Sequence, residues 1–308
     1  MFIVCGEALY DLFSTGPTPT GLGFDGRIGG SPFNVALGLA RLGQPVAFFG
    51  GIGTGFAGDR LMQALHDEGI DPACVARLDA PTTLSLVGVD ARGVPSYAFY
   101  GDGAADRLLA PEHLARIPPQ AQAFHFGSYA MVVKPVADTQ RLLVDRVHRD
   151  RLVAYDPNIR LNVEPDIAVW RNTLAWMLPR THLLKVSDED LGLLYPGRAV
   201  DDFIDEALAA GTPWVVVTRG GAGAVGATAR DRLVLPPQPV AVVDTVGAGD
   251  TFQAALLTWL AEHGRLSPAA VRALDGRALH AAMDFAMRAA ALTCSRRGAD
   301  LPRRQELG

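Results

Sequence analysis

Short apolar segments alternate with amphipathic segments along most of this 308-residue chain, and that alternation restricts the fold more than any other feature. A strand of a parallel sheet is buried on both faces and reads as a short apolar run, whereas a covering helix repeats its apolar residues every three or four positions. The predicted strands are residues 2–5, 46–51, 123–127, 152–155, 182–186 and 214–218. The predicted helices are residues 32–42, 57–68, 135–149, 166–177, 200–210, 249–263 and 276–294. The order of these segments predicts an α/β fold with a mainly parallel central sheet and helices on both faces.

Three regions depart from this alternation. Residues 8–30 and 82–101 have the texture of strands joined by glycine-containing turns, with a hairpin turn expected at 90–93. We expect these two regions to form a small β-sheet that projects from the main one. Residues 224–244 are expected to contribute short antiparallel strands.

The composition excludes several classes of partner. The net charge is −5 with both signs interspersed, which gives no reason to expect nucleic acid or an anionic membrane surface. No apolar run approaches the ~18 residues of a membrane helix, and the N-terminus lacks the basic region of a secretory signal. The three cysteines are far apart and indicate free thiols: Cys5, Cys74 and Cys294. We therefore expect a soluble cytoplasmic protein.

The helix predicted at 32–42 has clear start and stop signals. Ser31 is suited to the N-cap and Gly43 to the position after the C-terminus. Asn34 lies in the first turn, just after Gly30. A polar residue there can serve the turn itself or a ligand, and the local pattern alone leaves both roles open.

Two glycine-rich stretches compete for a phosphate-binding role, while the P-loop pattern G-x-x-x-x-G-K-[ST] is absent. The segment "GTGFAG", from Gly53 to Gly58, satisfies the dinucleotide pattern G-x-G-x-x-G, and Asp79 follows about 20 residues later. An NAD-dependent oxidoreductase is therefore one hypothesis. The match uses the second strand of the chain, however, and its glycines would serve equally well in a simple strand-to-helix turn.

The second stretch is "VVDTVGAGDTF", residues 242–252, which runs directly into a buried helix. Three residues with little side chain leave their N–H groups open to close approach: Gly247, Ala248 and Gly249. Such donors at the positive end of a helix dipole form an anion site, which stabilises charge that develops during a reaction. Asp250 beside them is placed to accept a proton from a hydroxyl group. The combination predicts deprotonation of an alcohol next to an incoming phosphoryl group.

These residues resemble a known family. The segment "DTVGAGDTFQAALL" (244–257) resembles the C-terminal signature of the ribokinase-like (PfkB) carbohydrate kinases, and "GGSPFNVALGLARLG" (29–43) resembles their N-terminal signature. The resemblance extends along the chain and includes "GEALYD" (6–11), "DPNIR" (156–160) and "VTRGGAGAV" (217–225). It implies one ribokinase-like domain over 1–308, with lid segments at about 8–30 and 82–101. It also implies transfer of a phosphoryl group from ATP, with Mg²⁺, to a sugar hydroxyl.

The resemblance assigns roles position by position. Asp250 would be the general base, and the backbone of 247–249 would be the anion hole. The sugar hydroxyls would be held by Asp11, Gly30 and Asn34. The nucleotide would be bound by Ser187, Thr218, Gly220, Gly223 and Gly249.

The metal positions follow from the same resemblance. Family members often show N-x-x-E where this chain has Ser187 to Asp190, so Asp190 takes the place of the glutamate that contacts the water shell of Mg²⁺. Asp244 and the Val246 carbonyl match a site for a monovalent cation such as K⁺ in some members. The family also implies a homodimer that pairs through the lid.

The identity of the sugar rests on two segments, "SYAFYGDGAADRLL" (96–109) and "FHFGSYAM" (124–131), which resemble bacterial fructokinases most. Fructose, converted to fructose 6-phosphate, is the expected substrate, with Tyr100 and Arg160 as further sugar contacts. Kinases for 2-keto-3-deoxygluconate tend to carry a basic residue after the lid tyrosine, whereas Gly101 follows Tyr100 here. Arg107 and Arg160 keep that acid sugar as an alternative. Another sugar or a nucleoside is a further alternative substrate within the family. A non-catalytic sugar sensor is a further alternative, although a sensor needs no base such as Asp250.

Overall fold

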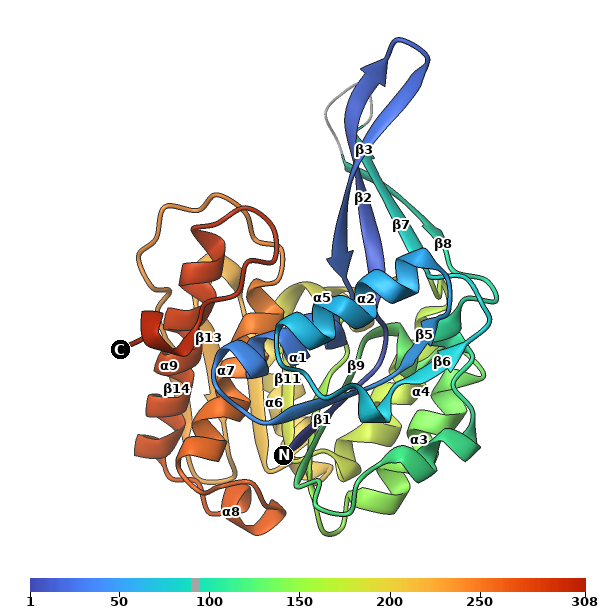
Figure 1. Ribbon diagram of the computed structural model, residues 1–308. Helices are drawn as coiled ribbons and strands as arrows, with labels where there is room; N and C mark the ends of the chain where they lie inside the picture. Colours follow the sequence, from blue (N-terminus) through green and yellow to red (C-terminus); the bar gives the residue numbers. More distant parts are fainter. Residues whose placement is uncertain (90–94) are drawn as a thin grey trace.

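The computed structural model describes residues 1–89 and 95–308, so the hairpin turn expected at 90–93 lies outside the described residues. An eight-stranded sheet with the order β14-β13-β12-β11-β10-β9-β1-β4 forms the centre (Figure 1). Its strands are β1 (Phe2–Cys5), β4 (Val46–Phe49), β9 (Ala123–Gly127), β10 (Leu152–Asp156), β11 (Leu183–Ser187), β12 (Trp214–Thr218), β13 (Ala224–Ala227) and β14 (Arg232–Leu235). The first six are parallel. Strand β13 runs antiparallel to β12, and β14 runs antiparallel to β13, as the sequence predicted.

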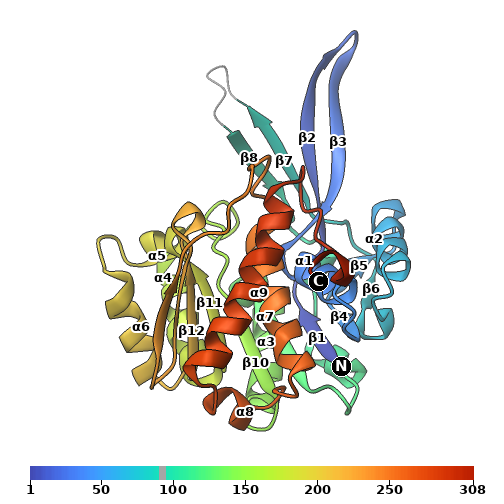
Figure 2. The same cartoon turned by 90° about the vertical axis from the view of Figure 1, so that its left-hand side faces the viewer.

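Helices cover both faces of this sheet, which confirms the predicted fold class. One face packs against α1 (Ser31–Arg41), α2 (Phe56–Asp67), α7 (Ala248–Glu262) and α9 (Gly276–Cys294). The other packs against α3 (Val136–Val147), α4 (Ile167–Met177), α5 (Asp188–Leu194) and α6 (Val200–Ala209), and the short α8 (Pro268–Arg272) lies at the lower edge (Figure 2). Successive residues of a strand point to opposite faces of the sheet. Val4 therefore packs in the core on the first face and Ile3 in the core on the second.

A second sheet projects from the main body as predicted (Figure 1, Figure 2). It has the order β3-β2-β7-β8, from β2 (Leu9–Thr18), β3 (Gly21–Gly29), β7 (Leu84–Val89) and β8 (Pro95–Tyr100). Strands β2 and β7 are parallel and the other two pairs are antiparallel. We call this sheet the lid.

Two local predictions need correction. The strand expected at 46–51 is divided: β4 ends at Phe49, and the chain then forms β5 (Gly51–Gly53), which pairs with β6 (Ala76–Leu78) in a separate two-stranded sheet. The N-cap of α1 is Gly30, with φ of 103°, and Ser31 is the first helical residue. Ser31 does not cap the helix, because its hydroxyl group donates to Asp250. Gly43 follows the helix with φ of 81°, as predicted.

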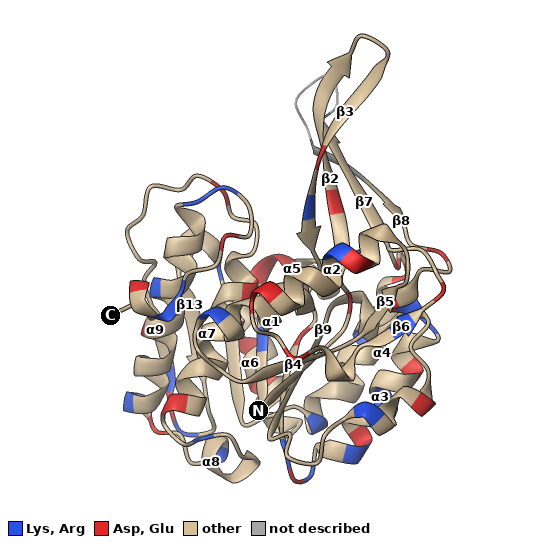
Figure 3. Cartoon of the chain, in the orientation of Figure 1, with Lys and Arg blue, Asp and Glu red and all other residues tan. Residues whose placement is uncertain are grey.

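The surface agrees with the expectations from composition. Lys and Arg are interspersed with Asp and Glu, and α3 carries both signs (Figure 3). Within the described part of the chain, no helix combines the length and the apolar character that a membrane crossing requires. The free thiols of Cys5 and Cys74 are buried, and that of Cys294 is half-buried.

Candidate active site

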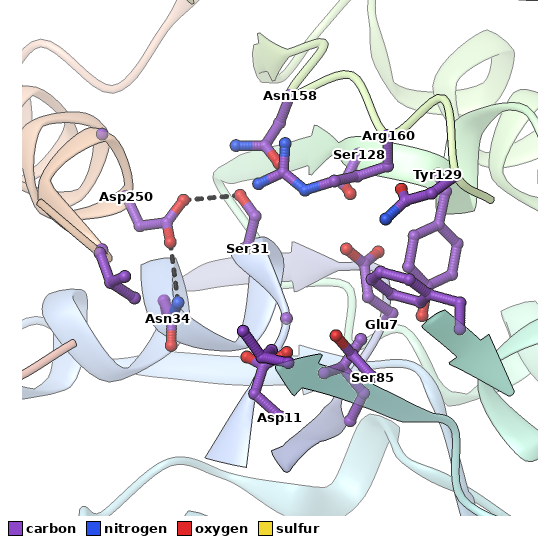
Figure 4. A pocket seen from close by; sticks show the side chains of 18 of the residues that line it. Glu7, Asp11, Ser31, Asn34, Ser85, Ser128, Tyr129, Asn158, Arg160 and Asp250 are labelled. Carbon is purple, nitrogen blue, oxygen red and sulfur yellow. Dashed lines mark hydrogen bonds between the residues drawn. The ribbon is translucent and has the colours of Figure 1, made fainter. Parts of the chain in front are cut away.

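A pocket of about 480 Å³ lies between the lid and the carboxyl ends of the parallel strands. This is the edge where ligands bind in open α/β sheets, because the loops that follow the strands meet there. The lid, α1, the loop after β10 and the start of α7 all contribute to its walls. Its polar lining includes Glu7, Asp11, Asn34, Ser85, Arg160 and Asp250 (Figure 4).

The glycine turn predicted as an anion hole forms one wall. Gly247 caps α7 in the left-handed region with φ of 78°, and a Cβ there would lie 2.8 Å from the Ala299 Cβ, so both conformation and space require glycine. Gly247, Gly249 and Asp250 line the pocket. Ala248 is not among the described lining residues, and its N–H donates to the Thr245 carbonyl at 3.2 Å. The amides left to face a ligand are therefore those on either side of Ala248.

Asp250 lies in the first turn of α7 and is only 6% exposed. The Ser31 hydroxyl donates to its Oδ1 at 2.6 Å, and the Asn34 side-chain amide donates to its Oδ2 at 2.8 Å (Figure 4). Both donors come from the first turn of α1, which the main sheet places next to α7. Two hydrogen bonds fix the carboxylate in one orientation toward the pocket, as a general base requires.

The residues predicted to hold the sugar line the same pocket, with one exception. Asp11 projects from β2, and burial raises the pKa of its carboxyl group, although Ser85 and Arg160 act in the opposite direction. Gly30 also lines the pocket, and a Cβ there would lie 2.7 Å from a backbone oxygen. Asn34 lines the pocket, but its side-chain amide N–H donates to Asp250.

Tyr100 is the exception. Of the described residues of β8, Phe99 lines the pocket and Tyr100 does not, and the Tyr100 side chain is 61% exposed. Successive strand residues point to opposite faces, so one of these two rings must face away from the sugar. Arg160 does face the pocket, and it also donates to the Ile159 carbonyl at 2.8 Å (Figure 4). Arg107 instead pairs with Asp102.

The predicted nucleotide residues gather at the ends of β11 and β12. Ser187 pairs with Thr218 in the sheet register, and Gly220 begins the turn that follows β12. Gly223 has φ of 83°, and a Cβ there would lie 2.0 Å from the Leu235 carbonyl oxygen, so packing alone already requires glycine at this position. None of these four is among the described residues that line the pocket. Gly249 does line the pocket. The α7 turn therefore belongs both to the pocket and to the predicted nucleotide-binding residues.

The predicted metal residues have protein partners. Asp190 is buried, accepts the Ile159 N–H at 3.1 Å with Oδ1, and donates its own N–H to the Ser187 hydroxyl oxygen at 3.0 Å. Asp244 accepts the N–H groups of Val246 at 3.1 Å and Gly298 at 2.8 Å, and these bonds lower its pKa against the effect of its partial burial. Over residues 1–89 and 95–308, no three His, Cys, Asp or Glu side chains are grouped to hold a metal ion by themselves. A carboxylate such as Asp190 fits contact through the water shell of a nucleotide-bound Mg²⁺, which needs few protein ligands.

A buried ion pair that no local sequence pattern indicates lies behind the α7 turn. The Lys185 ammonium donates to Asp156 Oδ2 at 2.8 Å, and the two side chains are 3% and 1% exposed. Burial raises the pKa of Asp156 to about 6, although Lys185 opposes this. A Cβ added at Gly249 would lie 2.9 Å from the Lys185 Nζ, so the ammonium lies directly against the turn. The available signal was composition, because Lys185 is one of only two lysines in an arginine-rich chain and stands inside an apolar strand.

Two further site residues were also missed. Local sequence patterns suggest the helix cap for Ser31 and give no role to Glu7 within "GEALYD", although Glu7 is a charged residue two positions after a buried strand. Both are buried and line the pocket.

Comparison with known proteins agrees with this geometry. The model of the pfkB family of carbohydrate kinases matches residues 2–306. A fructokinase of Rhizobium leguminosarum bv. trifolii is 35% identical over 306 residues, which cover 99% of this chain and 92% of that protein. The chain therefore belongs to the pfkB family of carbohydrate kinases.

Solved structures of two fructokinases are similar to this chain over almost their whole length. The crystal structure of fructokinase with bound ATP from Xylella fastidiosa superimposes with a TM-score of 0.89 at 27% identity, covering 99% of this chain and 96% of that one. Fructokinase from Vibrio cholerae O395, in its fructose-, ADP- and calcium-bound form, has a TM-score of 0.81 at 28% identity and covers 99% and 97%. The family membership excludes the oxidoreductase hypothesis. The glycines at Gly53 and Gly58 are required by close packing against backbone.

Proposed function

We propose that this protein is an ATP-dependent sugar kinase that transfers the γ-phosphoryl group to a primary hydroxyl of fructose, forming fructose 6-phosphate. The observation that supports this most is the Asp250 carboxylate, held by Ser31 and Asn34 at the start of α7 and facing the pocket. A base fixed beside backbone donors matches the needs of phosphoryl transfer to an alcohol, in which positioning and charge stabilisation dominate.

In the proposed reaction, Asp11 and the backbone at Gly30 hold the sugar with its primary hydroxyl toward Asp250. Asp250 accepts the hydroxyl proton as that oxygen attacks phosphorus, and the N–H groups at Gly247 and Gly249 stabilise the charge on the transferring group. The buried ammonium of Lys185 adds positive charge behind this turn. The lid excludes water when it closes over the sugar.

ATP is proposed to bind across the ends of β11 and β12, with Ser187, Thr218, Gly220 and Gly223 beside its phosphates and ribose. The bound ATP of the Xylella fastidiosa relative supports ATP as the nucleotide. Mg²⁺ on the nucleotide would neutralise phosphate charge, and Asp190 is the proposed contact to its water shell.

A K⁺ site at Asp244 and Val246 is a further proposal. Initial rates measured in KCl and in NaCl test it, and equal rates in the two salts would contradict it.

Charge favours a neutral sugar over 2-keto-3-deoxygluconate. The described lining contains the carboxyl groups of Asp11 and Asp250, a further acid at Glu7, and one arginine, Arg160, so acids outnumber bases even when Glu7 is neutral. A substrate carboxylate would meet a net acidic site, because the second candidate base, Arg107, pairs with Asp102 outside the lining. The fructose-bound relative from Vibrio cholerae O395 also supports fructose.

A coupled assay of ADP production tests the proposal with ATP·Mg²⁺ and fructose, ribose, 2-keto-3-deoxygluconate and adenosine. We expect kcat/KM for fructose to exceed the others by at least about tenfold, since a polar site rejects ligands that leave its groups unpaired. Conversion of the product by phosphoglucose isomerase identifies fructose 6-phosphate. A higher kcat/KM for another substrate would replace fructose, and sugar binding without turnover would favour the sensor alternative.

We propose that the protein forms a homodimer through the lid. Leu22 and Phe24 of β3 are 65% and 44% exposed, and Phe24 faces away from the pocket side that Phe13 occupies. Exposed apolar residues on a sheet face favour association. Analytical ultracentrifugation should show a dimer that Phe24→Asp converts to a monomer; a monomeric natural protein contradicts the proposal.

A further inference from the structure

The floor of the pocket holds a carboxyl group for which the reaction described above has no use. Glu7 follows β1, its side chain is 1% exposed, and it lines the pocket. Figure 4 shows it near Ser128 and Tyr129, on the side away from Asp250. Among the residues that the structure describes, its Oε2 has no hydrogen-bond partner. A buried polar atom without a partner lowers stability, so this oxygen is available to a ligand at little further cost.

The surroundings of Glu7 favour its neutral form. Asp106 lies nearby, and its carboxylate is already used by the Thr83 hydroxyl at 2.6 Å and the Tyr129 hydroxyl at 2.8 Å. Burial raises the pKa of Glu7 to about 8; the Asp106 charge adds to this effect, and Ser128 and Arg160 oppose it. The ionisable groups that face it or its neighbours are Asp11, Asp106, Arg107, Tyr129 and Arg160.

A neutral carboxyl group offers an O–H donor as well as an acceptor oxygen. The ring oxygen of a cyclic sugar can accept a hydrogen bond and cannot donate one, so an ionised carboxylate would repel it. Glu7 and Asp250 thus have complementary roles on the two sides of the pocket. Glu7 donates a hydrogen bond to the substrate, and Asp250 accepts a proton from it.

We propose that Glu7 is a specificity-determining residue that donates its carboxyl O–H to an acceptor oxygen of a neutral sugar, an inference that rests on the proposed sugar kinase function. Glu7 would contact the end of the sugar that is remote from the phosphorylated hydroxyl. This contact selects an uncharged cyclic polyol. Its binding then depends on the Glu7 proton.

The pH dependence of KM tests this. KM for the sugar should stay constant below about pH 8 and rise by about tenfold between pH 8 and 9.5, because the donor is lost as Glu7 ionises. Glu7→Gln keeps a donor and an acceptor at all pH values, so its KM should stay within about threefold of the natural protein at pH 7 and should not rise with pH. Glu112→Gln, at an exposed acid, is the matched control and should retain the natural profile.

Glu7→Leu removes the donor altogether. Its KM for the sugar should rise at least about tenfold, while kcat and the KM for ATP change less than about threefold, because Glu7 contacts neither the reacting atoms nor the nucleotide. Melting curves of both variants establish that they fold.

Calorimetry gives a readout that does not depend on turnover. Sugar binding to the natural protein at pH 8.5 should take up about 0.5–0.8 proton, measured in buffers of different ionisation enthalpy, and binding to Glu7→Gln should take up none. An unchanged KM in Glu7→Leu, or equal proton uptake by both proteins, overturns the assignment. Turnover of ribose in place of fructose would overturn the fructose proposal and leave this one standing, since both are neutral cyclic sugars.

Discussion

The segment from Gly53 to Gly58 and the segment from Gly247 to Gly249 both lead into the first turn of a helix, α2 in the first case and α7 in the second. Both are rich in glycine, and each helix has an aspartate in its first turn, Asp59 and Asp250. In the sequence the first turn matches the better-known phosphate-binding pattern. In the structure only the second turn lines the pocket.

The glycines of the two turns serve different purposes. A Cβ on Gly58 would lie 1.8 Å from the Gly53 carbonyl oxygen, and one on Gly53 would lie 2.4 Å from the Ala80 carbonyl oxygen. Backbone therefore fills the space where a dinucleotide would have to approach. At Gly249 the nearest atom is the Lys185 ammonium, which is a charge that an anion can use.

The two aspartates differ in the same way. Asp59 is exposed and pairs with Arg77 on the surface, a contact that contributes little to stability. Asp250 is buried and receives two hydrogen bonds from α1. A glycine pattern thus indicates that another group lies close to the backbone of the turn. Whether that group is a neighbouring chain segment or a ligand depends on the elements packed around the turn.

The largest expected effect separates the two aspartates. Asp250→Asn should reduce kcat by about 10²–10³ while sugar binding largely persists, because it removes the proton acceptor and keeps the shape. Asp59→Asn should leave kcat within about twofold. Steady-state kinetics with both variants measures this, and unchanged turnover in Asp250→Asn would falsify the assignment of the base.

Substitution of one glycine in each turn should separate activity from stability. Gly58→Ala should destabilise the protein by about 1–3 kcal/mol and lower its melting temperature by several degrees, because the added methyl group meets backbone. Gly249→Ala should lower kcat by about tenfold with a smaller loss of stability, because it displaces the ammonium and disturbs the amide beside it. The opposite pattern in calorimetry and kinetics would mean that the two turns have been assigned the wrong roles.

A smaller effect is expected for the α1 residue that orients the base. Ser31→Ala should lower kcat/KM by about fivefold, since one of two hydrogen bonds to the carboxylate is lost. Ser267→Ala provides the matched control: this serine accepts the Ala270 N–H at the start of α8, so its loss should cost about 1 kcal/mol of stability and no activity. Equal kinetics for the two serine variants would show that α7 positions Asp250 without help from α1.

Much of the fold was predictable because its signals are local. All thirteen predicted strand and helix starts coincide with the observed residue or differ from it by one; examples are β1 at Phe2, β12 at Trp214 and α7 at Ala248. The short α5 was missed because its seven residues show too few turns for a periodic pattern. Tyr100 was included among the sugar contacts although strand alternation already required a choice between it and Phe99.

The sequence by itself determined the alternation of strands and helices, the flexible turn before α7, and the presence of an acid beside it, because each depends on residues close together in the chain. Only the tertiary structure decided which side chains meet that acid: Ser31 and Asn34 lie 219 and 216 residues away from Asp250 along the chain. It also placed Lys185 against Gly249 and Glu7 on the pocket floor. Contacts of that range are set by how the sheet orders its strands, and no local pattern records that order.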